Sequence, residues 1–305
     1  MKLAAAAVHA RLLAALCGCL LAGANTAGAA SLVYEPFDYD ADTVLDGVPA
    51  TGQNLTGTWA TGDLVQQKLE AASPGLDYGN LVGAPTPSGN RLNDAAGVTA
   101  AFGTVEIDQD VLVAAGDEIF WSALFTFSDA LNGNHLASIR FRDSATDDSI
   151  TFGEPVVGVR TLRLETNTAA TGEIVANGAA GAFTDGQTFF VIGRYVNSAA
   201  PDGDSLDLIG YDTADADVLP GAFDPDDANA EFAYAIAGLD IDLTRIDEIR
   251  FTIRGTDSNF IDELRIGDSY ASVVPEPTTV TLLALGLAAG LCGSRRRGDP
   301  GPRHR

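Results

Sequence analysis

The central part of this 305-residue sequence predicts an all-β fold, either a sandwich of two sheets or a jelly roll. Two observations lead to this fold class. Short segments rich in β-branched and aromatic residues alternate between apolar and polar positions with period two. Clusters of Gly, Asn, Asp and Pro, which favour turns, separate these segments. Because we find no internal repeat and no dividing linker, we expect one domain over residues 31–272.

The expected strands follow from the alternating segments. FWSALFTF (120–127) is expected to be buried on one face and partly covered on the other. The first face carries Trp121, Ala123, Phe125 and Phe127, and the second carries Phe120, Ser122, Leu124 and Thr126. In IDEIRFTIR (246–254), strict alternation gives a polar face and a mostly apolar face, with Ile246 on the polar one. We expect strands at 120–127, 138–142, 149–152, 161–165, 188–196, 205–211, 246–254 and 259–266.

The charge and the cysteine count limit the class of protein. Residues 31–276 hold all but one of the chain's 42 acidic residues and 11 of its 18 basic ones, so their net charge is about −30. Such a surface repels phosphate backbones, and we therefore expect no nucleic-acid partner. Cys17, Cys19 and Cys292 all lie outside this part, which excludes internal disulfides there. His135 is its one histidine, which argues against histidine-based catalysis or metal binding.

The N-terminal 30 residues have the pattern of a secretory signal peptide. Lys2 and Arg11 make a basic start, residues 12–21 are apolar, and small residues end at Ala30. We therefore expect signal peptidase to remove residues 1–30. A buried N-terminal helix, or a lipid anchor at Cys19, are the alternatives.

The C-terminal end predicts a single transmembrane helix over residues 278–293. A helix of these 16 residues is about 24 Å long, short of the roughly 30 Å hydrocarbon core. Three arginines at 295–297 can reach the cytoplasmic interface and fix the orientation of the helix. Pro275 and Pro277 interrupt any regular element that enters from the domain before them. Residues 298–305 form a short polar tail.

These C-terminal features occur together and in order, and residues 273–297 resemble a PEP-CTERM sorting signal. The resemblance rests on a Pro-Glu-Pro motif, an apolar helix and an arginine cluster, that is, on Val274, Pro275, Glu276, Pro277, Arg295, Arg296 and Arg297. It implies that an exosortase-type membrane protease cuts near the motif. It also implies a protein that is exported, tethered to the membrane and then passed to the cell surface or extracellular matrix. The eight residues GDPGPRHR follow the arginines, where signals of this family usually end.

Short landmarks along residues 31–272 resemble the concanavalin A-like (laminin G-like) jelly-roll domains. They are LVYEPFDY (32–39), Trp59, PGLDY (74–78), GNRL (89–92), ITFG (150–153), DGD (202–204) and IDELRIG (261–267). The resemblance implies a concanavalin A-like β-sandwich between the signal peptide and the transmembrane helix. It does not select a function, because this fold carries lectins, hydrolases and modules without activity.

One stretch is a candidate for catalysis. Laminarinase-like glycosidases of this fold carry Glu-x-Asp-x-(x)-Glu on a strand, and EIDQD (106–110) resembles that pattern. Period two would place Glu106, Asp108 and Asp110 on one face, where two carboxylates can serve as nucleophile and acid. The last position is Asp instead of Glu, and Gln109 stands where an apolar residue is usual. A solvated acidic face is the alternative, and we expect that the protein is not an enzyme.

Binding of carbohydrate or calcium are two further possibilities. Sugar sites use exposed aromatic side chains, and the candidates Trp59, Trp121, Tyr211 and Tyr270 form no clear platform. Calcium prefers carboxylate and carbonyl oxygens in loops. Two acidic groups have that composition but lack the EF-hand pattern, and solvated loops explain them equally well: Asp202, Asp204 and Asp207, then Asp224, Asp226 and Asp227. We therefore expect no cofactor, with calcium as the alternative.

Together these features predict an exported bacterial cell-surface or matrix protein with a structural or adhesive role, in contact with extracellular polysaccharide. A lectin-like carbohydrate-binding module is the first alternative. A laminarinase-like glycoside hydrolase is the second.

Overall fold

The computed structural model describes residues 31–62, 68–82, 84, 89–94, 100–127, 136–154, 163–168, 172–177, 186–200, 202–241, 243–254 and 259–274. All of them belong to one compact unit, Ala29–Pro275. The predicted signal peptide, the transmembrane helix, the sorting residues after Val274, the polar tail and His135 lie outside the described residues. Within these ranges, no helix has the length and apolar character needed to cross a bilayer.

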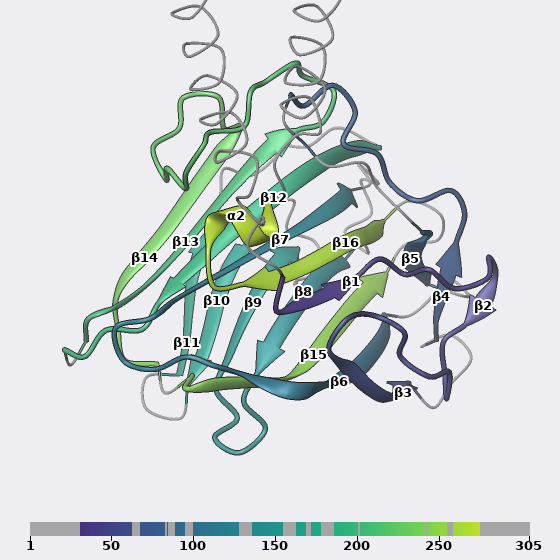
Figure 1. Cartoon of the computed structure of the whole chain (residues 1–305), viewed down its shortest axis with the longest axis horizontal. Helices are drawn as coiled ribbons and strands as arrows, with labels where there is room; N and C mark the ends of the chain where they lie inside the picture. The colour runs from purple at the N-terminus through teal and green to yellow at the C-terminus, as the bar shows by residue number, and fades with distance from the viewer. Residues whose placement is uncertain are drawn as a thin grey trace, which may run out of the picture. The chain divides into compact units, whose positions relative to one another are not determined.

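The described residues form two antiparallel sheets (Figure 1). The larger sheet has nine strands, and β1 (Val33–Glu35) pairs with β16 beside the main path. In spatial order that path is β14 (Phe232–Leu239), β13 (Asp204–Asp212), β12 (Gln187–Val196), β7 (Glu118–Phe127), β16 (Phe260–Gly267), β5 (Arg91–Asp94), β4 (Leu69–Ala72) and β2 (Thr43–Val44).

The smaller sheet has seven strands. Their order is β11 (Gly172–Asn177), β10 (Arg163–Thr168), β9 (Ser149–Glu154), β8 (Leu136–Arg142), β15 (Arg245–Arg254), β6 (Ala101–Leu112) and β3 (Leu55–Thr61). The predicted all-β sandwich of two sheets is confirmed. The expected strands correspond to β7, β8, β9, β10, β12, β13, β15 and β16.

Apolar side chains from both sheets meet in the core of the sandwich. On β7, Trp121, Phe125 and Phe127 point into this core and are fully buried. Gly193 on the neighbouring strand β12 leaves room for the indole of Trp121, because a β-carbon at Gly193 would overlap that ring. The predicted full burial of the face of 120–127 that carries Trp121 is confirmed.

A second apolar layer covers the outer face of the nine-stranded sheet. Leu124 of β7 and Phe190 of β12 lie there, beneath Tyr78 and the short helix α2 (Tyr270–Val273). Figure 1 shows α2 over β7 and β16, the two strands that it contacts. The other face of 120–127 is therefore buried as well.

A register shift in β15 alters one sequence prediction. The pairing of β15 with β6 is irregular between Ile246 and Glu248. Residues 107–110 of β6 lie opposite Asp247 alone, and Asp247 and Glu248 are both partly exposed. The alternation of β15 is therefore interrupted there, and Ile246 is buried in the core together with Ile249, Phe251 and Ile253. Strict alternation wrongly placed Ile246 on the polar face, since period two fails across a bulge.

Four of the sequence landmarks come together in space. The carboxylate of Asp262 accepts hydrogen bonds from the amides of Leu76 (2.7 Å) and Glu263 (2.8 Å). Gly89 has φ +77°, and a β-carbon there would overlap the Pro36 carbonyl. Asn90 donates its side-chain amide to the Tyr39 carbonyl at 2.6 Å. The landmarks 32–39, 74–78, 89–92 and 261–267 therefore form one structural junction around β16.

This junction contains buried charges. Glu263 is fully buried and accepts hydrogen bonds from the Tyr34 hydroxyl (3.0 Å) and the Arg265 guanidinium (2.8 Å). Burial raises the pKa of Asp262 to about 9. Asp262 is therefore protonated near pH 7, and the buried charges of the junction are those of the hydrogen-bonded pair Glu263 and Arg265.

The two ends of the described domain are held together. The Ser31 hydroxyl donates to the Ser272 carbonyl at 2.6 Å, and the Leu32 amide donates to the Ile266 carbonyl at 2.7 Å. The buried hydroxyl of Ser122 donates to the Val273 carbonyl at 2.7 Å. Val273 and Val274 are both buried, so the folded structure continues to the residue before Pro275.

Candidate functional site

The predicted carboxylates Glu106, Asp108 and Asp110 lie on β6, and all three are exposed. β6 is an interior strand, between β15 and β3. Val105 and Ile107 point into the core, so the alternation that predicted one shared outer face holds as far as Asp108. Glu106 stands opposite Glu248 on one neighbouring strand and Thr56 on the other.

Residues 107–110 form the wide side of the bulge opposite Asp247. Asn54, with φ +59°, holds this stretch: its side chain exchanges two hydrogen bonds of 3.0 Å with the Gln109 backbone. Asp110 accepts from the Arg245 guanidinium at 3.3 Å. The three carboxylates are therefore spread along an irregular segment, and one of them already has a cationic partner.

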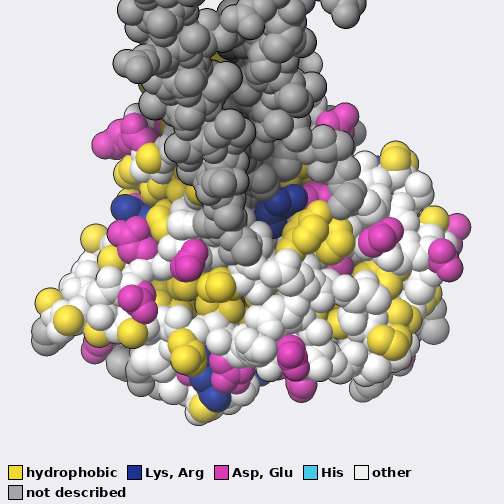
Figure 2. Space-filling view, in the orientation of Figure 1, with side chains coloured by type: hydrophobic (Ala, Val, Ile, Leu, Met, Phe, Trp, Pro, Cys, Tyr) yellow, Lys and Arg dark blue, Asp and Glu magenta, His cyan; other side chains and the backbone are white. Residues whose placement is uncertain are grey.

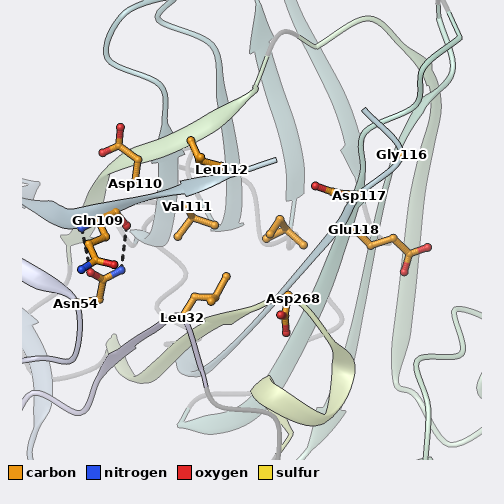
Figure 3. A pocket seen from close by; sticks show the side chains of 11 residues that line it. Leu32, Asn54, Gln109, Asp110, Val111, Leu112, Gly116, Asp117, Glu118 and Asp268 are labelled. Carbon is orange, nitrogen blue, oxygen red and sulfur yellow. Dashed lines mark hydrogen bonds between the residues drawn. The ribbon is translucent and has the colours of Figure 1, made fainter. Parts of the chain in front are cut away.

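A cleft of about 660 Å³ lies beside the end of this segment (Figure 3). Four carboxylates line it, from Asp110, Asp117, Glu118 and Asp268. Its apolar lining comes from Leu32, Val111, Leu112 and Ile119, and no aromatic side chain is among its lining residues. A cleft with this charge disfavours anionic ligands.

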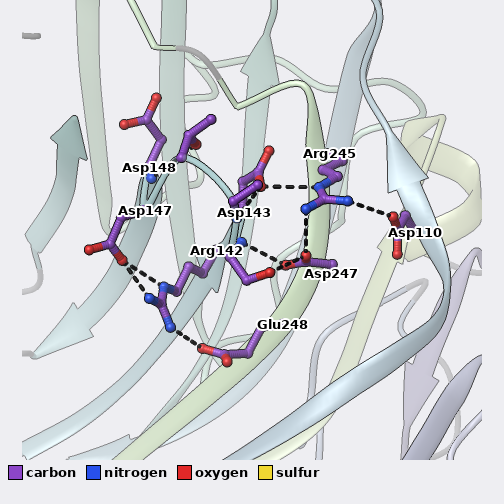
Figure 4. A network of polar contacts seen from close by, with 11 residues as sticks. Asp110, Arg142, Asp143, Asp147, Asp148, Arg245, Asp247 and Glu248 are labelled. Atoms are coloured by element: carbon purple, nitrogen blue, oxygen red, sulfur yellow. Dashed lines mark hydrogen bonds and ion pairs between the residues drawn. The ribbon is translucent and has the colours of Figure 1, made fainter. Parts of the chain in front are cut away.

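A network of ion pairs joins the β8–β9 loop to β15 and β6 (Figure 4). Arg245 contacts Asp143 at 3.1 Å and Asp247 at 3.2 Å, in addition to Asp110. Arg142 contacts Asp147 at 2.7 Å and Glu248 at 3.1 Å. Two arginines thus offset part of the charge of these five carboxylates from within the chain.

The two acidic groups considered for calcium are not arranged as single sites. Asp204 accepts from the amides of Ser198 (2.7 Å) and Ile241 (2.9 Å), whereas Asp207 pairs with Arg194 at 2.8 Å. Asp204 and Asp207 are three positions apart, an odd spacing that puts their side chains on opposite faces of β13. Asp202 is exposed in the preceding turn.

In the second group, Asp224 and Asp227 bind backbone amides of their own turns at 3.0 Å. Asp227 also accepts from the Tyr211 hydroxyl at 2.8 Å, and Asp226 is exposed. Within the described ranges, no group of three or more His, Cys, Asp or Glu side chains is placed to hold a metal ion.

The four aromatic candidates for sugar stacking are all buried. Trp59 and Trp121 belong to the core, where the Trp59 indole donates to the Tyr39 hydroxyl at 2.8 Å. Tyr211 and Tyr270 belong to the second apolar layer. None of these side chains is available as an exposed stacking platform.

The outer face of the seven-stranded sheet carries a row of polar side chains that crosses four strands. Thr151 of β9, Arg140 of β8, Arg250 of β15 and Thr104 of β6 are direct cross-strand partners in that order. All four are partly exposed, and we call them the arginine row.

The two arginines of this row are supported differently. Arg250 lies over the ring of Phe102, with its guanidinium carbon 4.5 Å from the ring centroid. The Nε of Arg140 is buried and has no hydrogen-bond partner among the described residues. Burial, and then the positive charges of Arg142 and Arg250, lower the pKa of Arg140 below its usual value.

Sequence reasoning missed the arginine row. The pattern of 246–254 placed Arg250 on a polar face, which is confirmed. Its juxtaposition with Arg140 depends on the register between β8 and β15, whose segments lie more than 100 residues apart. On the face of the domain drawn in Figure 2, side chains of Asp and Glu are scattered over the surface, and those of Lys and Arg occur in only a few places.

Comparison with known proteins confirms the sorting signal. Residues 273–297 match the PEP-CTERM protein-sorting motif. Such signals are processed by exosortase, a membrane protease, so the chain is an exported protein that is sorted to the cell surface. No curated protein matches the chain in sequence.

Solved structures with a similar architecture include three concanavalin A-like or lectin-like domains. The T. cruzi calreticulin globular domain has a TM-score of 0.49 and 10% identity, over 87% of this chain and 98% of that one. Lectin II from Ulex europaeus has a TM-score of 0.37 and 10% identity, over 61% of this chain and 90% of that one. A β-1,3-glucanase from Mycobacterium marinum has a TM-score of 0.39 and 10% identity, over 77% of this chain and 98% of that one. At these values the likeness concerns the fold and carries no functional argument.

Proposed function

We propose that this chain is a cell-surface or extracellular-matrix protein with an adhesive or structural role toward polysaccharide. In this proposal a signal peptide is removed, a short C-terminal helix tethers the protein, and an exosortase-type protease then releases it. The ectodomain is a concanavalin A-like module without catalytic activity and without a required cofactor.

The observation that carries the sorting part is the position of the motif relative to the fold. Residues 273–297 match the sorting motif, and the folded domain continues into its first two residues, Val273 and Val274. Ser31, the first residue after the predicted signal peptide, is hydrogen-bonded to Ser272. Removal of both terminal segments therefore leaves every described strand in place.

Two observations support a binding role over a catalytic one. Glu106 and Asp108 are exposed, and among the described residues no polar side chain contacts them to orient them, while Asp110 pairs with Arg245. Glycosidases instead use two carboxyl groups held on either side of the scissile bond. The polar outer face of the seven-stranded sheet, with the arginine row, offers a surface for a lectin-like contact, which is our second candidate function.

Replacement of Pro275, Glu276 and Pro277 by alanine tests the sorting proposal in a host that contains exosortase. We expect the variant to remain in the membrane fraction, uncut, while the wild type reaches the surface or medium with a lower mass. The control variant R303Q/R305Q changes two arginines of the polar tail and should be sorted normally. Equal processing of the alanine variant and the wild type would contradict the proposal.

A further inference from the structure

Among the described residues, Arg140 and Arg250, like Arg254, have no carboxylate within ion-pair distance, whereas four other arginines of the domain do. Arg142, Arg194, Arg245 and Arg265 each have an acidic side chain within ion-pair distance. Within the part of the chain that the structure describes, neither arginine of the row has such a contact, although acidic residues far outnumber basic ones.

The placement of these two arginines is unfavourable for the isolated fold. They are directly opposite each other on adjacent strands, where side chains start about 5 Å apart and like charges destabilise a sheet. A local arrangement that lowers stability and has no evident stabilising contact to offset it is typical of a functional site.

The same placement suits an anionic ligand. Two guanidinium groups on neighbouring strands present forked donors that match the oxygens of a carboxylate or sulfate. An anion between them would reduce their mutual repulsion and could supply an acceptor for the unpartnered Nε of Arg140. The acidic cleft of Figure 3 offers no such complementarity.

The surroundings of the row favour a sugar-borne anion over a free ion. Thr151 and Thr104 flank the two arginines. On the same face, Thr252 lies two residues beyond Arg250 on β15, and its cross-strand partner on β6 is Phe102. Hydroxyl groups can bind sugar hydroxyls, and the half-buried Phe102 ring adds apolar surface beside the cations.

We propose that the arginine row, centred on Arg140 and Arg250, binds the anionic groups of an acidic polysaccharide. This inference rests on the proposed adhesive function and names its ligand class. Carboxylates oppose the approach of a polyanion, and three of them lie near the row. Glu248 and Glu106 are two residues along β15 and β6 from Arg250 and Thr104 on the same face. Glu165 of β10 is the cross-strand partner of Thr151. At about 0.15 M salt the Debye length is about 8 Å, so the repulsion from more distant carboxylates is largely screened.

The test uses the full-length chain, purified in mild detergent, on three immobilised polymers at about 0.15 M salt. Polygalacturonate carries carboxylates, dextran sulfate carries sulfates, and dextran is neutral. We expect the wild type to bind at least one acidic polymer and to bind dextran much more weakly. R140Q and R250Q should each weaken binding about tenfold, and R140Q/R250Q about 100-fold. K68Q is the matched control, because it removes one positive charge elsewhere and should change affinity less than twofold.

The outcomes separate this inference from the proposed function. Equal affinity of wild type and R140Q/R250Q for the acidic polymers would overturn the role of the row and leave an adhesive function elsewhere on the domain. A wild type that binds none of the three polymers would overturn the adhesive function and the inference together. If the double variant unfolds at a lower temperature, R250K replaces it, because lysine keeps the charge but lacks the forked donors. Severalfold weaker binding by R250K with an unchanged midpoint supports the proposal, and unchanged binding refutes it.

Discussion

Glu35 on β1 gives the domain a pH-dependent stability that one substitution can isolate. Its carboxyl group is fully buried, accepts a hydrogen bond from the Phe37 amide at 2.7 Å, and lies 3.4 Å from the Tyr39 hydroxyl. Burial raises the pKa of Glu35 from 4.5 to about 7, although these hydrogen bonds favour the charged form. The folded protein therefore keeps a proton that the unfolded chain releases at lower pH.

The sign and the size of the effect follow from linkage. Between pH 4.5 and 7 the folded state binds more protons than the unfolded state, so the free energy of unfolding decreases as the pH rises. Each pKa unit corresponds to about 1.4 kcal/mol, so Glu35 lowers stability by about 3 kcal/mol across this window. Above pH 7 its contribution is constant.

Glu35→Gln removes this titration and keeps the size of the side chain. Urea unfolding of the fragment 31–274 at pH 4.5 and pH 8 should show the variant losing about 3 kcal/mol less than the wild type over that range. Asp262 and the other buried groups titrate in both proteins, so the difference isolates Glu35. Glu106→Gln, at an exposed position, is the matched control. Parallel pH profiles for Glu35→Gln and the wild type would refute the reasoning.

Three other expectations concern stability. Gly193→Ala should lower the free energy of unfolding by about 1–3 kcal/mol, because its β-carbon would overlap the Trp121 ring, whereas Gly221→Ala, with open space around it, should be nearly neutral in urea unfolding. Ser122→Ala removes the donor to the Val273 carbonyl, so we expect a loss of about 1–2 kcal/mol and faster proteolysis near residues 270–274; an unchanged digestion rate would count against this docking. Calcium at 1 mM should leave the melting temperature unchanged, since Asp204 and Asp207 already bind other groups. A site with a Kd near 10 µM would instead add about 2.7 kcal/mol, reversed by chelator.

The sequence predicted the interior strands well because local pattern determines them. The apolar segments 120–127 and 188–196 are long, rich in β-branched and aromatic residues, and lie at the centre of the larger sheet. Short strands such as β2 (Thr43–Val44) carry too few residues for a period to be visible. Bulges are also invisible, since the shift near Ile246 depends on the pairing partner and not on the segment itself.

The sorting signal could be predicted because it is contiguous, whereas sites that depend on register could not. Strict alternation along the sequence places Glu106 and Asp110 on one face of the strand. The structure has a bulge between them, and Asn54, about 50 positions earlier in the sequence, holds that bulge through the Gln109 backbone. Arg140 and Arg250 meet only through the β8–β15 pairing. The landmarks around Asp262 were noticed as scattered matches, and the structure shows that they share one structural junction.

The attachment of the tail has a mechanical consequence. The described chain ends just after α2, which follows β16, and β16 is hydrogen-bonded to β7 on one side and to β5 and β1 on the other. Under the proposed tethering, a pull on the C-terminal end loads α2 and then an interior strand. Extraction of that strand must break two ladders at once, whereas an edge strand such as β14 is held by one. Under the proposed adhesive function, this connection would let a domain held by the cell at one end and by a polymer at the other bear tension before it unfolds.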